Sequence, residues 1–207
     1  MDKRDLLVLI DCGHGSNTPG KRSPDNSIQE WSYTRVLGGM IMDKLYMCGI
    51  KYKLIHPEPS ELGKVSEDLK LRATRANTFA RETDKQCILI SLHLNAAANG
   101  EWKNATGWSA YTSKGLTKAD KLADYLYEAA EEVLTPLGKK IRKDNTDGDP
   151  DFEENFYVLK HTIMPAVLTE NFFMDNKDDV AWLNSKEGKA ALVDIHIKGI
   201  LKYIYGK

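Results

Sequence analysis

Residues 87–95, CILISLHLN, form the stretch of the chain with the clearest strand pattern. Apolar and polar residues alternate from Ile90 to Asn95, which is the two-residue period of a β-strand. A second short apolar run, residues 6–11, leads into a glycine-rich loop and predicts another buried strand. Around these two segments, strand patterns alternate with helix patterns. This alternation predicts an α/β protein.

The remaining segments extend the alternation along the chain. Further strands are predicted at residues 51–56, 107–112, 156–160 and 165–169. Helices are predicted from Ser27 to a stop at Gly49, at 69–81, at 117–134, and over most of the segment that ends at residue 204. No repeat, low-complexity tract or linker divides the chain. Residues 1–207 are therefore expected to form one domain, with a central sheet, mostly parallel or mixed, flanked by helices.

Composition excludes several classes of protein. The chain has 207 residues, and its formal net charge of -1 gives no electrostatic reason to expect nucleic-acid binding. The short basic cluster at 139–143 lacks interleaved aromatic residues and is interpreted as a solvated loop end. The three cysteines contain no CxxC pair, so neither a disulfide framework nor a cysteine zinc site is expected. No apolar run approaches the roughly 18 residues that span a membrane.

The first residues, MDKRDLLVLID, do not match a signal peptide, because the apolar run is short and no small-residue cleavage site follows it. Any action outside the cytoplasm is therefore expected to need phage-type release or a leader that has been trimmed away. The sequence contains no indication of oligomeric state.

Three residues have the chemistry of metal ligands. His14 lies in the loop after the first strand, Glu30 lies early in the following helix, and His93 lies near the end of the strand at 87–95. Ligands gather outside the carboxyl ends of strands in open α/β sheets. Two histidines and one carboxylate form a zinc set that leaves a position for water. Glu170, at the end of a predicted strand, is a candidate general base and acid.

Each residue also has a structural interpretation. Ser27-x-x-Glu30 matches a helix capping box, which would make Glu30 a local structural group. His93 alternates with apolar residues, a pattern more typical of a hydrogen-bonded core histidine than of a ligand. Glu170 taken alone is an ordinary charge at a strand end. From the residues singly, both interpretations remain open.

Several blocks, taken together, resemble the amidase-3 family of zinc-dependent N-acetylmuramoyl-L-alanine amidases, which includes bacterial autolysins and phage endolysins. They span about residues 6–183 in the family's order. The blocks are LVLIDCGHG at 7–15, Glu30, LRATRAN at 71–77, SLHLNAA at 91–97, Gly107-Trp108 and VLKHTIMPAVLTENFFMDNKDD at 158–179. The chain departs from the family pattern at Cys12, at Trp31 and at residues 171–173. None of these departures removes a candidate catalytic residue.

The resemblance implies a function and a set of roles. It implies that residues 1–207 are a catalytic amidase domain that binds zinc (Zn2+) through His14, Glu30 and His93. It implies that Glu170 is the catalytic carboxylate, taking a proton from water and passing it to the departing nitrogen. The expected substrate is peptidoglycan, cleaved between the muramic acid lactyl group and L-alanine. Two alternatives remain: a zinc peptidase acting within the stem peptide, and a catalytically silent peptidoglycan-binding domain.

Other chemically suggestive residues are interpreted as structural. His56, His161 and His196 have no partner at ligand spacing. The acidic loop with Asp147, Asp149 and Asp151 fails the EF-hand calcium pattern, because Phe152 and Val158 stand where that loop needs Gly and Glu. Trp31, Trp102, Trp108 and Tyr111 could stack on sugars, but packing in the core or at its rim is the default for aromatic residues.

Overall fold

The fold is built on one mixed sheet of six strands. A computed structural model describes residues 2, 5–98, 100–146 and 148–206. The strands follow the order β2-β1-β3-β6-β4-β5, and all pairs are parallel except β4 with β6. Their bounds are β1 Leu6–Cys12, β2 Lys51–Leu54, β3 Gln86–Asn95, β4 Trp108–Thr112, β5 Phe152–Glu153 and β6 Ala166–Phe173. The predicted fold class is confirmed.

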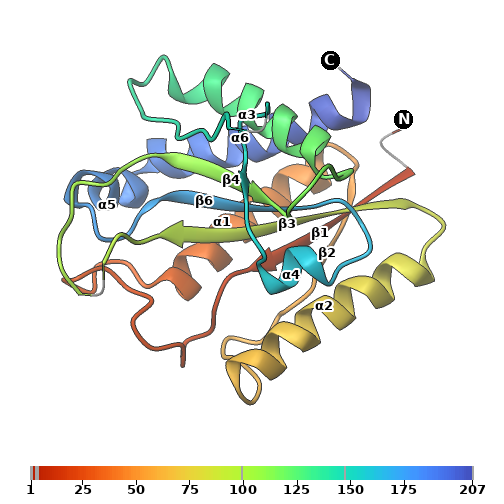
Figure 1. Ribbon diagram of the computed structural model, residues 1–207, viewed down its shortest axis with the longest axis horizontal. Helices are drawn as coiled ribbons and strands as arrows, with labels where there is room; N and C mark the ends of the chain where they lie inside the picture. The colour runs from red at the N-terminus through yellow and green to blue at the C-terminus, as the bar shows by residue number, and fades with distance from the viewer. Residues whose placement is uncertain (1, 3–4, 99, 147, 207) are drawn as a thin grey trace.

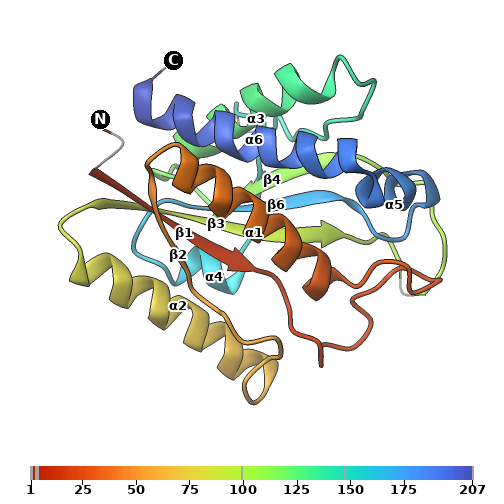
Figure 2. The ribbon, with the colours of Figure 1, turned by 180° about the vertical axis from the view of Figure 1, so that it is seen from behind.

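Helices cover both faces of the sheet, which gives three layers (Figures 1 and 2). One face carries α1 Glu30–Met47, α3 Asp120–Leu134, α5 Lys177–Asn184 and α6 Lys186–Tyr205. The other face carries α2 Val65–Glu82 and the short α4 Tyr157–Lys160. Among the described residues, no helix is long and apolar enough to cross a membrane.

Strand β1 shows why the central strands are apolar throughout. Leu6, Val8 and Ile10 pack into the core beneath α1, α3 and α6, while Leu7 and Leu9 point into the smaller core beneath α2 and α4. A strand covered on both faces gains from burying every side chain, so its sequence is a continuous apolar run instead of an alternation. The covered strands end in polar residues at one edge of the sheet.

One predicted element has the wrong type. Residues 156–160 were expected to form a strand, but Tyr157–Lys160 form the helical turn α4. The carbonyl of Phe156 accepts hydrogen bonds from the backbone N–H groups of Leu159 and Lys160. The adjacent residues Val158 and Leu159 are both buried against the smaller core, which a strand with one face covered would not allow. Periodicity cannot separate helix from strand in so short an apolar run.

The acidic loop before β5 holds carboxylate oxygens that are buried among the described residues. Asp147 lies outside the described residues. Asp151 is buried and accepts a 2.7 Å hydrogen bond from the Thr112 hydroxyl. Its other oxygen and one oxygen of Asp149 are buried, and the two carboxyl groups are close enough to share a hydrogen bond when one of them is protonated. Burial and the neighbouring charge of Asp149, opposed by the Thr112 hydrogen bond, raise the pKa of Asp151 to about 7.

This environment predicts that Asp151→Asn stabilises the protein at alkaline pH. A carboxyl whose pKa is raised on folding binds more protons in the folded than in the unfolded state, so stability falls as pH rises from about 4 to about 7. Asparagine keeps the Thr112 hydrogen bond without the buried charge. We expect Tm to rise by about 2–4 °C at pH 8 and to change little at pH 4. A thermal scan at both pH values measures this, and a destabilised variant at pH 8 would contradict it.

Candidate metal centre and catalytic cavity

Three side chains from separate elements meet at one edge of the sheet. His14 follows β1, Glu30 is the first residue of α1, and His93 lies near the end of β3. One ligand atom from each residue lies within 4.8 Å of the others. No other group of three such residues with this spacing occurs in the described part of the chain. The structure thus brings together the three predicted ligands as a candidate metal site.

Glu30 is buried at the centre of this group. One carboxylate oxygen lies 3.1 Å from Nδ1 of His93 and accepts a 3.0 Å hydrogen bond from the Leu94 N–H. The other lies 3.5 Å from Nε2 of His14 and has no hydrogen-bond partner. The capping-box alternative is wrong, because Gln29 is the N-cap residue of α1 and its side chain makes no cap hydrogen bond. Ser27 bonds to Asp25 instead.

His14 is held in an unusual backbone conformation by its neighbours. Its φ of 60° is in the left-handed region, which few residues other than glycine adopt. Glycine is needed on both sides of His14, because other parts of the chain come too close to the backbone there to leave room for a side chain. A Cβ at Gly13 would lie 2.4 Å from the His93 ring, and one at Gly15 would lie 2.2 Å from the Glu61 nitrogen. The His14 and His93 rings meet edge to face, with centroids 5.0 Å apart.

The protonation of this group suits metal binding. Burial, opposed by the Glu30 charge, lowers the pKa of His14 to about 3, so its imidazole is neutral at pH 7. Burial alone would also favour the neutral forms of Glu30 and His93. Their mutual hydrogen bond prevails, so that the pKa of Glu30 is lowered and that of His93 is raised. A cation with two positive charges would replace the proton that this pair shares.

Glu170 lies beside the group. Strand β6 runs parallel to β3 with Glu170 in register with His93, so both side chains point to the same face of the sheet. Burial raises the pKa of Glu170 to about 8; the charge of Glu30 adds to this shift, while His93, Lys21 and Arg142 oppose it. One carboxylate oxygen is buried and has no hydrogen-bond partner. The predicted catalytic carboxylate thus lies next to the candidate metal site.

A buried polar network behind the site fixes the loop that bears His14. Arg72, on α2, forms ion pairs with Asp11 at 2.7 Å and Asp68 at 2.6 Å. The same guanidinium donates hydrogen bonds to the carbonyls of Cys12 at 2.7 Å and His14 at 3.1 Å. Sequence reasoning quoted the LRATRAN block but did not identify this role. Asp11, a charge at the end of an apolar strand, is the sequence feature from which a buried cationic partner could have been predicted.

His93 is positioned by a residue that departs from the family pattern. The Asn171 side-chain amide donates to the His93 carbonyl at 3.0 Å and accepts from the Trp108 indole at 3.1 Å. Trp108 is fully buried, so it packs in the core and offers no ring to a sugar. The neighbouring Phe172 takes φ 69°, which is strained for a bulky residue. The residues at 171–173 that differ from the family pattern therefore help to position His93, through the hydrogen bond from Asn171 to the His93 carbonyl.

The remaining histidines have structural positions. His56 is buried and lies 2.7 Å from Asp68, and His196 is buried 3.0 Å from the Thr169 hydroxyl. His161 is exposed and stacks on Tyr157 with ring centroids 4.1 Å apart. None of the three lies in the group formed by His14, Glu30 and His93.

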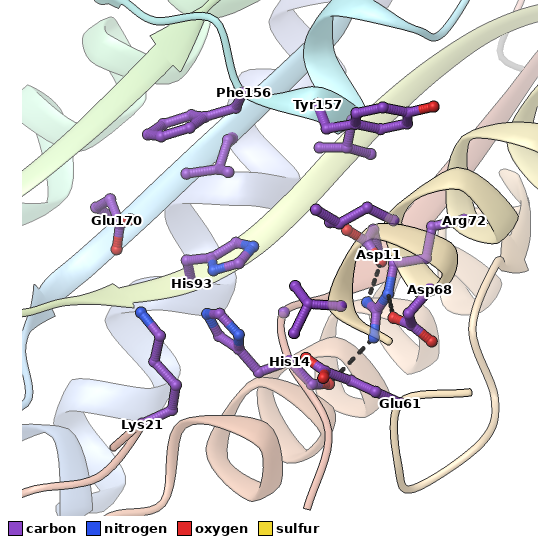
Figure 3. A pocket seen from close by; sticks show the side chains of 15 residues that line it. Asp11, His14, Lys21, Glu61, Asp68, Arg72, His93, Phe156, Tyr157 and Glu170 are labelled. Carbon is purple, nitrogen blue, oxygen red and sulfur yellow. Dashed lines mark hydrogen bonds and ion pairs between the residues drawn. The ribbon is translucent and has the colours of Figure 1, made fainter. Parts of the chain in front are cut away.

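The site opens into a cavity of about 240 Å³ between α2 and α4. One wall is polar and carries His14, His93, Glu170 and Lys21 (Figure 3). The remaining wall is largely apolar and is contributed by Val65, Leu69, Phe156, Tyr157, Val158 and Leu168. An apolar cavity with a few convergent polar groups is the usual form of a site for an organic substrate.

Comparison with known proteins assigns the family. Residues 8–202 match the amidase-3 family model, described as N-acetylmuramoyl-L-alanine amidase. The chain belongs to this family. The expected enzyme class, a hydrolase of the N-acetylmuramoyl-L-alanine amidase type, is thereby confirmed.

Individual relatives share modest sequence identity but nearly the whole fold. The chain is 26% identical to the N-acetylmuramoyl-L-alanine amidase CwlM of Bacillus licheniformis over 95% of its own length and 68% of the relative's. It is 28% identical to the endolysin of Bacillus phage SPP1, over 96% and 66% of the two lengths. The crystal structure of an N-acetylmuramoyl-L-alanine amidase from Clostridium difficile 630 superposes with a TM-score of 0.80 at 25% identity, covering 99% of both chains. The chain thus spans about two thirds of these two sequence relatives.

Proposed function

We propose that this protein is a zinc-dependent amidase that hydrolyses the amide bond between the muramic acid lactyl group and L-alanine of bacterial cell-wall peptidoglycan. The observation that carries the proposal is a pair of buried carboxylate oxygens without a hydrogen-bond partner, one on Glu30 between the two histidines and one on Glu170, which lines the cavity. A buried oxygen of this kind is costly unless a cation or a substrate proton satisfies it. Family membership agrees with the proposal.

The donor set fits zinc. Two imidazole nitrogens and one carboxylate oxygen, from His14, His93 and Glu30, are the ligands of many catalytic zinc sites. His14 is neutral and ready to bind, and the second oxygen of Glu30 is unpaired. A zinc ion bound here would supply Lewis acidity, which lowers the pKa of water and polarises a carbonyl oxygen.

Glu170 is proposed to move the proton. Its buried carboxylate takes a proton from the attacking water as the new C–O bond forms at the lactyl carbonyl carbon. It then gives that proton to the alanine nitrogen as the C–N bond breaks. Burial raises the pKa of Glu170 above that of an ordinary carboxyl, and the positive charge of a zinc ion bound beside it would oppose that shift, so that the group could both accept and return a proton.

Mass spectrometry of purified peptidoglycan, digested with the protein plus zinc or plus a chelator, tests this function. We expect free stem peptides with an L-alanine amino terminus, released with zinc and lost at least about 100-fold on chelation, because the metal supplies both activation steps. Products shortened within the stem would indicate a peptidase instead. Binding to sacculi without any product would indicate a silent binding domain.

A further inference from the structure

Lys21 lines the cavity beside the proposed catalytic groups, and the proposed mechanism does not use it. It lies in the loop between β1 and α1 and lines the cavity with His14, His93 and Glu170. Figure 3 shows its amine directed toward the space between Glu170 and the two histidine rings. Its charge lowers the pKa of both His14 and Glu170, which places the ammonium within electrostatic reach of both. The ammonium therefore faces the reacting region.

The backbone of Lys21 is fixed to the metal site. Its carbonyl accepts a 3.0 Å hydrogen bond from the N–H of Glu30, the first residue of α1. The next residue, Arg22, forms an antiparallel bridge with Gln29. Beyond it, Ser23 and Ile28 pair through a 2.9 Å backbone hydrogen bond that closes the loop. The position of Lys21 is thus set by the same turn that delivers Glu30.

The ammonium has no counter-ion within the described residues. No carboxylate lies within 4.0 Å of its nitrogen there, and no hydrogen bond of its side chain is found. The other cations near the cavity are engaged. Arg72 is bound to Asp11 and Asp68, and Arg142 lies over the rings of Phe152 and Phe173 at 5.3 and 5.2 Å. Among the described groups, Lys21 is the cation left to meet a substrate.

We propose that Lys21 is a further catalytic residue, whose ammonium donates a hydrogen bond to the substrate carbonyl oxygen as that oxygen becomes negative in the transition state. The inference rests on the proposed function. The substrate amide is neutral before attack, so a cation aimed at it gains most when charge develops. The C–O and C–N bonds and the Glu170 proton change as already described. Lys21 keeps its own proton throughout.

The alternative is that Lys21 binds a carboxylate of the stem peptide in the ground state. The two roles differ kinetically. Loss of a transition-state contact lowers kcat for every substrate, whereas loss of ground-state binding raises KM for substrates that carry the carboxylate. The location of Lys21 beside Glu170 and the metal ligands, away from the apolar wall, favours the first role.

The test compares Lys21→Met with the wild type on two soluble muramyl peptides, one with a free carboxylate on the second stem residue and one with a carboxamide. We expect kcat to fall about 100-fold on both, the size of loss seen when one oxyanion donor is removed, with KM nearly unchanged. Lys21→Arg is expected to restore part of kcat. Arg22→Met, in the same loop but exposed, is the matched control and should match wild type.

Zinc affinity gives a readout independent of turnover. Removing a cation from the edge of the site is expected to leave zinc binding as tight as in the wild type or a few-fold tighter. Unchanged kinetics, loss of zinc, or a KM increase confined to the carboxylate substrate would each overturn the assignment of Lys21. A zinc-loaded wild type that releases no L-alanine peptide would instead overturn the proposed function, and this inference would fall with it.

Discussion

Replacing Glu170 with glutamine is expected to lower kcat by about 10³-fold while zinc remains bound, since a positioned general acid–base group contributes about 10²–10⁴ in rate. Glutamine has nearly the same shape but cannot take the proton from water. Because Glu170 is absent from the group of three ligands, its replacement should spare metal binding. Release of stem peptides from peptidoglycan measures the rate, and elemental analysis of the purified variant measures bound zinc.

Two comparisons make this result specific. Glu154→Gln changes an exposed glutamate outside the cavity and should keep wild-type activity. Glu30→Gln should lose zinc and activity together, since Glu30 lies between the two histidines. Full activity of the Glu170 variant with zinc bound would contradict its role as the proton carrier, and loss of zinc would show that it acts through the metal site instead.

All strands except the two-residue β5 could be predicted from sequence, because each of the others carries its own signal. Residues 6–11 and 87–95 are apolar runs that end in polar residues, and the covered faces of the sheet require that pattern. His14 has a left-handed backbone conformation and is flanked by glycines, because neighbouring groups leave no room for side chains at those two positions. The Gly-His-Gly sequence therefore indicates a functional site. Local sequence therefore identified the elements and the metal-ligand candidates, once the family's blocks were considered together.

What local sequence could not supply is contact between distant residues. Glu30 was compatible with a helix cap by spacing, and only the approach of β3 brings His93 and Leu94 to its carboxylate. Lys21 lies in a loop with no periodic pattern, and its direction depends on the turn that closes before α1. The short helix α4 has too few residues for any period to be measured. The features that could not be predicted from local sequence lie at or beside the cavity.

Arg72→Met is expected to lower the free energy of unfolding by about 3–5 kcal/mol, the usual cost of leaving buried charges without their partner. The guanidinium is 2% exposed and neutralises two buried carboxylates, Asp11 and Asp68. It also donates to the His14 carbonyl, so zinc affinity should fall together with stability. Urea denaturation measures the first effect, and zinc titration of the folded variant measures the second.

Arg75 offers a matched control on the same helix. It pairs with Glu58 at 2.6 Å, but both side chains are more than a quarter exposed, so Arg75→Met should cost less than about 1 kcal/mol. The buried network predicts a further result. In the triple variant Arg72→Met, Asp11→Asn and Asp68→Asn, the unpaired charges are gone, and much of the lost stability should return. Zinc affinity should stay below that of the wild type, because only the Arg35 guanidinium, at 3.1 Å, is then left to hold the His14 carbonyl. If affinity recovered with stability, Arg72 would be needed only to neutralise Asp11 and Asp68, and the hydrogen bond from Arg35 would be enough to hold the His14 carbonyl.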